Sequence, residues 1–355
     1  MSKINIIPIF VPHLGCPNDC VFCNQKKIAS EITDVDESYL DARIKEYLSY
    51  FRDKSNIEIA FYGGSFTAIN LDKQESFLKI AKSYKNLGLI HRIRLSTRPD
   101  CIDENILSML KKYGVDIIEL GVQSLNEDVL LKSKRGHDAD CVFKSSDLIK
   151  SWGFTLGLQQ MIGLPGDDKE KIYYTACKFK EIDPDIVRIY PSLVITQTQM
   201  EKDYLKGIYN PLTLNEAVEI SKELLKFYRI NDIDVIRIGL QPTENIQLGK
   251  DVVAGPFHPS IRQLVEGEIM RDIIVDYFKD RNTNNKDLFI FCSNKNISNL
   301  SGQKKIVKNK IIKDLNLSSL KLSYRDLPDS KLMFFLDKEE TINIKDYLKT
   351  EIKCI

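Results

Sequence analysis

Seven short apolar or β-branched runs, separated by segments with helical spacing, constrain the fold of this chain more than any other feature. Each run ends close to turn-forming residues, as buried strands do. The runs cover residues 4–11, 57–62, 90–96, 115–122, 154–162, 186–195 and 235–240. Strands that alternate with helices predict an α/β fold with a parallel sheet and right-handed crossovers, either a closed TIM-like (β/α) barrel or an open, partial one.

Capping patterns mark where helices begin between these strands. Asp103 is placed to cap a helix whose apolar residues recur at helical spacing, and Gly114 is placed to end it. The stretch from Thr213 to Glu216 has a capping-box pattern, and Asp167 with Glu170 forms a looser version.

A polar, turn-rich stretch, RNTNNKD at residues 281–287, predicts a boundary between a barrel domain (1–280) and a small α+β domain (287–355). We expect the small domain to contain strands at 288–292, 320–324 and 331–336 and a helix at 303–315. That helix carries lysines at 304, 305, 308, 310 and 313. They form either a solvated helix face or a surface that contacts nucleic-acid phosphates.

Composition excludes several classes of protein. The hydrophobic fraction is 43%, and 51 Lys and Arg balance 50 Asp and Glu, so neither disorder nor a strongly charged surface is expected. No apolar stretch is long enough for a membrane span, and the N-terminus lacks the pattern of a secretory signal. We therefore expect a cytoplasmic protein, whose eight cysteines stay reduced.

Three of the eight cysteines gather in HLGCPNDCVFCNQ, directly after the first predicted strand. Cys16, Cys20 and Cys23 can surround one inorganic centre, and thiolate ligands favour an iron–sulfur cluster or zinc. Three ligands leave one iron of a 4Fe–4S cubane open. The alternatives are a structural zinc with His13 as fourth ligand, or cysteines that are merely small buried apolar residues. The iron–sulfur cluster is favoured over zinc, because a zinc finger would need a second pair of ligands. The other cysteines show no paired spacing.

The C-x₃-C-x₂-C spacing, with Phe22 before the last cysteine, resembles the signature of the radical S-adenosylmethionine (SAM) superfamily. Six further motifs follow in the order of the subgroup that holds the Elongator catalytic subunit and the oxygen-independent coproporphyrinogen oxidases. The resemblance covers about residues 4–265. The motifs are FYGGSFT (61–67), LSTRPD (95–100), ELGVQS (119–124), KRGHDAD (134–140), MIGLPGD (161–167) and RIYPSLVI (188–195).

This resemblance implies a 4Fe–4S cluster and SAM as cofactors. The cluster would be held by the three cysteines, and its open iron chelated by the amino and carboxylate groups of SAM. By the same resemblance, Gly63 and Gly64 would meet the methionyl amino group, Gln123 and Gln159 the ribose, and Ser96, Arg135 or Arg98 the carboxylate. The strand register decides whether Gln159 or Gln160 points inward. We also considered His258 as the border of a substrate pocket.

The resemblance implies an enzyme that cleaves SAM reductively to a 5′-deoxyadenosyl radical, with an electron from a flavodoxin- or ferredoxin-like donor. RNA is one substrate that the Elongator-like motifs favour. The first cysteine gap is narrower than in the Elongator subunit, and about 70 residues after Asp287 are too few for its acetyltransferase domain. The alternative hypothesis is a zinc-stabilised α/β nucleic-acid-binding protein without catalysis.

Overall fold

The computed structural model describes residues 4–11, 19–24, 35–241 and 245–351. Its contacts divide the chain into two compact units. The N-terminal unit comprises Met1–Leu214 and Ile233–Phe257, and the C-terminal unit comprises Asn215–Asp232 and His258–Ile355. The domain boundary expected at residues 281–287 falls inside the C-terminal unit and stays a prediction.

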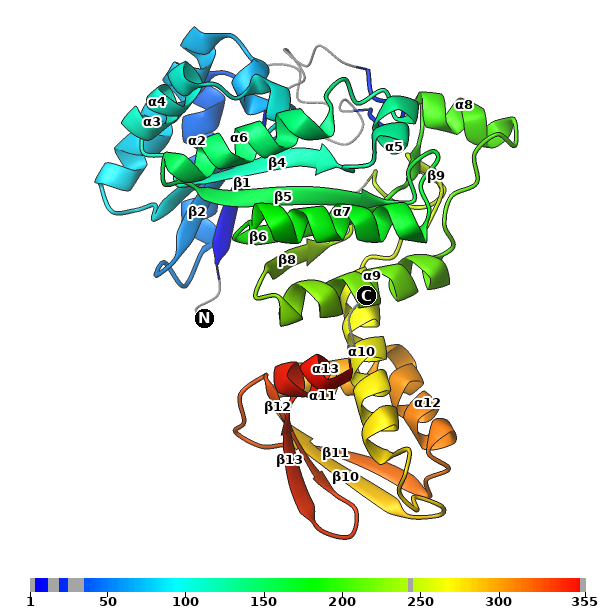
Figure 1. Ribbon diagram of the computed structural model, residues 1–355. Coiled ribbons are helices and arrows are strands. Elements are labelled where there is room, and N and C mark those ends of the chain that lie inside the picture. Colours follow the sequence, from blue (N-terminus) through cyan, green and yellow to red (C-terminus); the bar gives the residue numbers. More distant parts are fainter. Residues whose placement is uncertain (1–3, 12–18, 25–34, 242–244, 352–355) are drawn as a thin grey trace. The chain divides into compact units, whose positions relative to one another are not determined.

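A seven-stranded, wholly parallel sheet forms the centre of the N-terminal unit (Figure 1). Its order is β1-β2-β3-β4-β5-β6-β8, so neighbouring strands follow one another along the chain and the sheet is a partial barrel. The predicted α/β partial-barrel class is therefore confirmed. The strands are β1 (Asn5–Val11), β2 (Ile57–Gly63), β3 (Arg92–Thr97), β4 (Ile117–Gln123), β5 (Thr155–Ile162), β6 (Ile186–Pro191) and β8 (Asp234–Ile238).

Helices follow most of these strands, and several begin at the caps that the sequence predicts. Asp103 accepts the N–H of Ile106 at 2.8 Å, and Gly114 has φ +75° after the helix ends. No helix in the described part of the chain is both long and apolar enough to cross a membrane. The helices are α2 (Glu37–Tyr50), α3 (Leu71–Asn86), α4 (Glu104–Lys112), α5 (Glu127–Lys132), α6 (Ala139–Ser151), α7 (Lys169–Ile182) and α8 (Gln199–Leu205).

The predicted cap of α7 is wrong by one residue. Asp168, not Asp167, accepts the N–H of Lys171 at 2.9 Å and caps the helix. Asp167 instead turns back and accepts the N–H of Gly163 at 3.0 Å. Asp167 and Asp168 are adjacent, and the conformation of the turn before α7 determines which of them caps this helix.

The run at 186–195 is two strands rather than the single predicted one. β6 ends at Pro191, and β7 (Val194–Ile195) leaves the parallel sheet to pair antiparallel with β9 (Val252–Ala254). A continuous apolar run of sequence does not reveal that the chain changes partner within it.

A four-stranded sheet, in the order β11-β10-β12-β13, forms the centre of the C-terminal unit (Figure 1). β10 and β11 are parallel, whereas β12 and β13 run antiparallel to their neighbours. Its strands are β10 (Asp287–Cys292), β11 (Ser319–Tyr324), β12 (Lys331–Phe335) and β13 (Glu339–Asn343). Its helices are α9 (Leu214–Ile230), α10 (Ile261–Phe278), α11 (Asn294–Ser301), α12 (Ile306–Asp314) and α13 (Ile344–Glu351).

The predicted helix at 303–315 begins three residues late. Lys304 and Lys305 have φ of +50° and +63°, so residues Gln303–Lys305 form a separate 3₁₀ turn before α12. Helices α11 and α13 and strand β13 were not predicted, because each is short and carries at most three apolar residues.

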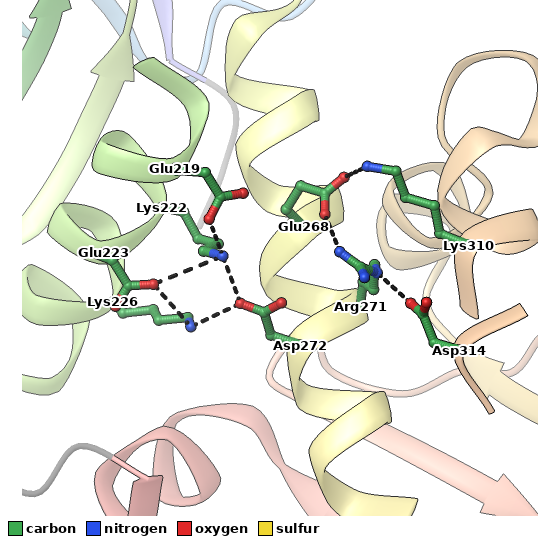
Figure 2. A network of polar contacts seen from close by, with 9 residues as sticks. All are labelled: Glu219, Lys222, Glu223, Lys226, Glu268, Arg271, Asp272, Lys310 and Asp314. Carbon is green, nitrogen blue, oxygen red and sulfur yellow. Dashed lines mark hydrogen bonds and ion pairs between the residues drawn. The ribbon is translucent and has the colours of Figure 1, made fainter. Parts of the chain in front are cut away.

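Ion pairs on both sides of α10 tie together the helices of the C-terminal unit (Figure 2). On one side, Asp272 accepts from Lys222 and Lys226 of α9 at 2.9 and 3.1 Å. On the other side, Glu268 pairs with Lys310 and Arg271 pairs with Asp314, both contacts reaching α12. These pairs occupy Asp314, the only acidic side chain of α12.

Candidate functional site

The cysteine loop lies at the carboxyl edge of the parallel sheet, where ligands bind in folds of this class. Cys20 is buried, and the N–H of Cys23 donates to its carbonyl at 2.9 Å. Val21 between them donates to Ser133 at 3.1 Å and accepts from Met200 at 2.9 Å. The loop is therefore held from two sides. Cys16 and His13 lie outside the described residues.

Arg135 connects the cysteine loop to β4. Its Nη1 donates to the Sγ of Cys20 at 3.4 Å, and its Nη2 donates to the carbonyl of Gly121. A Cβ at residue 121 would come within 2.9 Å of that Nη2, so the contact requires glycine there. The Nε of Arg135 is buried without a hydrogen-bond partner among the described residues.

Two further polar atoms at this edge are buried without such a partner. They are the Oγ of Ser96 in β3 and the Oε1 of Gln123 in β4. Gln123 ends its strand with φ +73°, next to a break in the register with β5. A non-glycine residue in the left-handed region is uncommon and costs free energy, and such strain gathers at ligand sites. Buried polar groups usually have partners, so these three atoms are suited to a bound polar ligand.

Arg98 is occupied within the protein. Its Nε and Nη2 bind both carboxylate oxygens of Asp100 at 2.8 and 2.9 Å, and Nη2 also donates to the carbonyl of Arg135 at 2.7 Å. The side chain is only 2% exposed. Arg98 therefore fixes the backbone that carries Arg135.

The structure decides the orientation of the two adjacent glutamines of β5. The Nε2 of Gln160 donates to the carbonyl of Ile172 in α7, which covers the outer face of the sheet. Because side chains alternate along a strand, Gln159 lies on the inner face. It is paired in register with Arg188 of β6.

The two glycines after β2 keep the backbone at the edge uncovered. Gly63 has φ +104°, which only glycine adopts readily. The N–H of Gly64 donates to the carbonyl of Val11 at 3.2 Å and joins the turn to the end of β1.

Below this edge, four buried charged side chains cross the inner face of the sheet; we call them the interior ladder. It consists of Glu58 (β2), Arg94 (β3), Glu119 (β4) and Arg188 (β6). Arg94 bridges the two carboxylates, at 2.5 Å to Glu58 and 2.8 Å to Glu119. Arg188 binds both oxygens of Glu119. These two acids and two bases sum to zero, and Arg92 of β3, whose side chain is partly exposed, also binds Glu58 at 2.6 Å.

Burial alone would raise the pKa of Glu119, but Arg188 and Arg94 hold it below its ordinary value. Glu119 therefore stays ionised at neutral pH. Arg188 also donates to the Tyr62 hydroxyl at 2.9 Å, and burial raises the pKa of that phenol.

The turn after β5 contains Asp167. Burial raises the pKa of its carboxyl group to about 7, although backbone N–H donors of the turn act in the opposite direction and lower this pKa. Gly163 and Gly166 take φ of +75° and +79° here, and the Tyr209 hydroxyl donates to the carbonyl of Gly163 at 2.6 Å. His258, in contrast, belongs to the C-terminal unit, where its Nδ1 accepts the N–H of Ser260 just before α10.

The interior ladder was not predicted from the sequence. A signal was present: IEIAFYG, RIRLST, IIELGVQ and IVRIYP each carry a charge inside an otherwise strand-like run. Charges at inward positions of neighbouring strands indicate mutual pairing, because unpaired buried charges are too costly.

Two family models match the chain: the radical SAM superfamily over residues 10–176, and the radical SAM C-terminal domain over residues 184–271. The chain belongs to the radical SAM superfamily. The first model runs from the end of β1 to the middle of α7 and includes Cys20, Arg135 and Gln123. Both models end before the C-terminal sheet begins at β10.

Curated relatives agree with this membership, and one solved structure shares the fold. A tRNA uridine(34) acetyltransferase of Methanocaldococcus jannaschii is 28% identical over 261 residues, which are 62% of this chain and 48% of the relative. An uncharacterized protein of the same organism is 30% identical over 237 residues, 63% of this chain and 72% of its own. Elp3 from Methanocaldococcus infernus shares the fold with a TM-score of 0.63 and 22% identity, covering 77% of this chain and 64% of that structure. The chain spans about half the length of the acetyltransferases it matches.

Proposed function

We propose that this radical SAM protein cleaves SAM reductively and directs the resulting radical to an RNA substrate. The observation that carries the first part is the group of buried polar atoms without partners, Ser96 Oγ, Gln123 Oε1 and Arg135 Nε. They lie at the carboxyl edge of the sheet, and Arg135 also reaches Cys20. That donor and acceptor set suits an amino acid joined to a ribose.

In the proposed site, Cys16, Cys20 and Cys23 would hold a 4Fe–4S cluster. When bound, the cluster supplies the low-potential electron that breaks a sulfonium C–S bond of SAM. A cluster held by thiolates is anionic, and the guanidinium of Arg135 would offset that charge as well as bind the carboxylate of SAM. The electron donor would be a flavodoxin- or ferredoxin-like protein.

The remaining residues of the proposed site would bind and position SAM. Gly63 and Gly64 leave backbone groups open to the methionyl amino group, and Ser96 adds a hydroxyl for the carboxylate end. Gln123 and Gln159 would hydrogen-bond the ribose from neighbouring strands. Arg98 would act by holding Arg135, since Asp100 and the Arg135 carbonyl already bind its Nε and Nη2.

The RNA substrate is supported by the relatives named tRNA uridine(34) acetyltransferases. Acetyl transfer is not part of the proposal, because the chain spans about half of those relatives. What the proposal takes from them is the class of substrate.

Anaerobic reconstitution with iron and sulfide tests the first part. The protein should turn brown, bind about four irons and release 5′-deoxyadenosine with dithionite and SAM. Cys20→Ala should abolish cluster and product, whereas Cys177→Ala, a half-buried cysteine on α7, should leave both unchanged. Colourless protein with one bound zinc would instead support the alternative of a zinc-stabilised binding protein.

Two variants test the proposed SAM ligands separately from the cluster. Ser96→Ala and Gln123→Leu should weaken SAM binding in titration calorimetry and leave the cluster absorbance intact, whereas Arg135→Met should affect both, because Arg135 also contacts Cys20. To test the substrate, unmodified tRNA transcripts are added to the reconstituted protein. Faster release of 5′-deoxyadenosine supports RNA, while an unchanged rate with every transcript contradicts it.

A further inference from the structure

The four-stranded sheet of the C-terminal unit has two chemically different faces. Phe334 of β12 packs against Tyr277 and Phe278 of α10, with ring centroids 5.0 and 5.3 Å apart. Its face is therefore the one that the helices cover. Side chains alternate along a strand, so Phe335 lies on the opposite face, where it is 43% exposed.

Four large apolar side chains lie together on this second face, which we call the open face. Phe289 of β10 pairs in register with Phe335, and Phe291 pairs with Met333 of β12. The rings of Phe289 and Phe335 are 6.2 Å apart and meet edge to face. All four side chains are at least partly exposed. A contiguous exposed apolar patch in a small domain usually marks a binding surface.

Cations stack on the rings of the open face. Lys321 of β11 places its Nζ 4.6 Å from the centre of the Phe289 ring, and the guanidinium of Arg325 lies 5.7 Å from the Phe291 ring. Each cation also pairs with one acid, Lys321 with Asp287 at 3.3 Å and Arg325 with Glu339 at 3.4 Å. All four charged groups are exposed, and such pairs contribute little free energy, so phosphates can replace the carboxylates.

The charge of this part of the chain fits a polyanion. Residues 281–355 contain 15 Lys and Arg against 9 Asp and Glu, a net charge of +6, whereas the whole chain carries +1. Helix α12 packs beside β11, the edge strand that carries Lys321. The only acidic residue of α12, Asp314, forms an ion pair with Arg271 (Figure 2). The exposed lysines of the α12 segment, Lys304, Lys305 and Lys313, make no ion pair with a described residue.

We propose that the open face of the C-terminal sheet binds unstacked bases of a single-stranded RNA segment. This inference rests on the proposed function for the identity of the nucleic acid, and it adds a recognition surface outside the residues that the family models match. Phe289, Phe291 and Phe335 would stack on the bases, and Lys321 and Arg325 would contact phosphates. Base faces are accessible only where RNA is not paired, so the surface favours loops or single strands over duplex.

Binding of a fluorescein-labelled single-stranded RNA of about 12 nucleotides to the full chain, without reconstitution, tests the proposal by fluorescence anisotropy. Phe335→Ala should raise the Kd about five- to hundredfold, the usual effect of losing one stacking ring. Phe335→Trp should bind like wild type, whereas Phe335→Leu, which keeps apolar area but no aromatic face, should bind like the alanine variant. Far-UV circular dichroism melting confirms that each variant is folded.

Tyr174→Ala is the matched control. Tyr174 on α7 is 46% exposed and has Lys178 beside its ring at 5.7 Å, so it repeats the exposed aromatic–lysine pair in the other unit. It should leave the Kd unchanged. An equal Kd for a duplex of the same sequence, or wild-type binding by Phe335→Leu, would overturn the proposal.

A second copy of the chain is the competing occupant. Concentration-dependent dimerisation in analytical ultracentrifugation that Phe335→Ala removes, without RNA binding, would also overturn the proposal. Release of 5′-deoxyadenosine by the reconstituted Phe335→Ala protein, without RNA, separates the outcomes. If that release equals wild type while neither the wild-type protein nor any variant binds RNA, the open face is not the RNA site and SAM cleavage still stands.

Discussion

Replacing Glu119 by glutamine should destabilise the N-terminal unit by about 3 kcal/mol. Glu119 is 1% exposed and is the acid that Arg94 and Arg188 share. Glutamine keeps the volume and one acceptor oxygen but removes the negative charge. The interior ladder is then left with one acid, Glu58, for two guanidiniums. Breaking a buried pair by removing one partner costs about 3–5 kcal/mol, and the retained acceptor favours the lower end.

The pH dependence of this difference has a definite sign. The pKa of Glu119 in the folded protein is lowered from 4.5: burial raises it, but Arg188 and Arg94 outweigh burial. A lowered pKa contributes stability that is present above the unfolded value and lost as the pH falls through the folded value. The gap between wild type and Glu119→Gln should therefore be full at neutral pH and shrink below about pH 4.

Urea unfolding followed by tryptophan fluorescence measures this effect where it occurs. The chain has one tryptophan, Trp152, which follows α6 in the N-terminal unit. Its signal therefore reports unfolding of that unit rather than an average over both units.

A double-mutant cycle with Arg188→Met tests whether charge pairing is the cause. In the double variant Glu58 and Arg94 remain as a neutral pair, so its destabilisation should be smaller than the sum of the single effects by about 2 kcal/mol. Asp128→Asn is the control for an exposed acid with two lysine partners, and it should lower the free energy of unfolding far less than Glu119→Gln does, because water screens exposed pairs. Additive single effects, or a Glu119→Gln cost as small as that of the control, would refute the reasoning.

Two further changes have expected outcomes. Gly121→Ala places a Cβ 2.9 Å from the Arg135 Nη2 and should weaken SAM binding in calorimetry far more than it lowers the melting temperature; unchanged affinity would show that Arg135 is not a ligand. The pKa of Asp167 is raised from 3.8 to about 7, chiefly by burial, so its contribution to stability is full at low pH and lost as the pH rises through about 7. Asp167→Asn should therefore gain stability relative to wild type between about pH 5 and 8, and parallel urea midpoints over that range would contradict this.

The fold could be predicted from the sequence because each strand of the parallel sheet is a dense apolar run with a turn after it. The same rule failed where the chain changes partner without changing composition, as between Pro191 and Val194. It also failed at Lys304 and Lys305, since lysine gives no sign that its backbone is left-handed. Short polar elements such as β13 depend on tertiary contacts, and the residues of one short segment do not reveal those contacts.

The proposed site could be predicted only as far as its motifs reach. Ser96 and Gln123 lie at the carboxyl ends of neighbouring strands, as a parallel sheet requires, and Arg135 reaches the same edge from the loop after α5. The direction of individual side chains could not be predicted. The structure points Gln160 toward α7 and leaves Gln159 on the inner face, and it pairs Arg98 with Asp100. Those outcomes depend on register and on local partners, which residue identity does not fix.

The interior ladder follows from leaving a barrel partly open. A closed barrel fills its interior with apolar layers, but an open one must present part of its inner face to water and to a charged ligand. Ion-paired side chains can lie next to water and next to a charged ligand, provided that their charges sum to zero. The four charges of the interior ladder sum to zero, and Arg92 beside them is already paired with Glu58. In the proposed site, the ladder would therefore neither repel the carboxylate of SAM nor offer it an unpaired guanidinium. Arg135, whose Nε has no hydrogen-bond partner among the described residues, would then be the cation that binds that carboxylate in the proposed site.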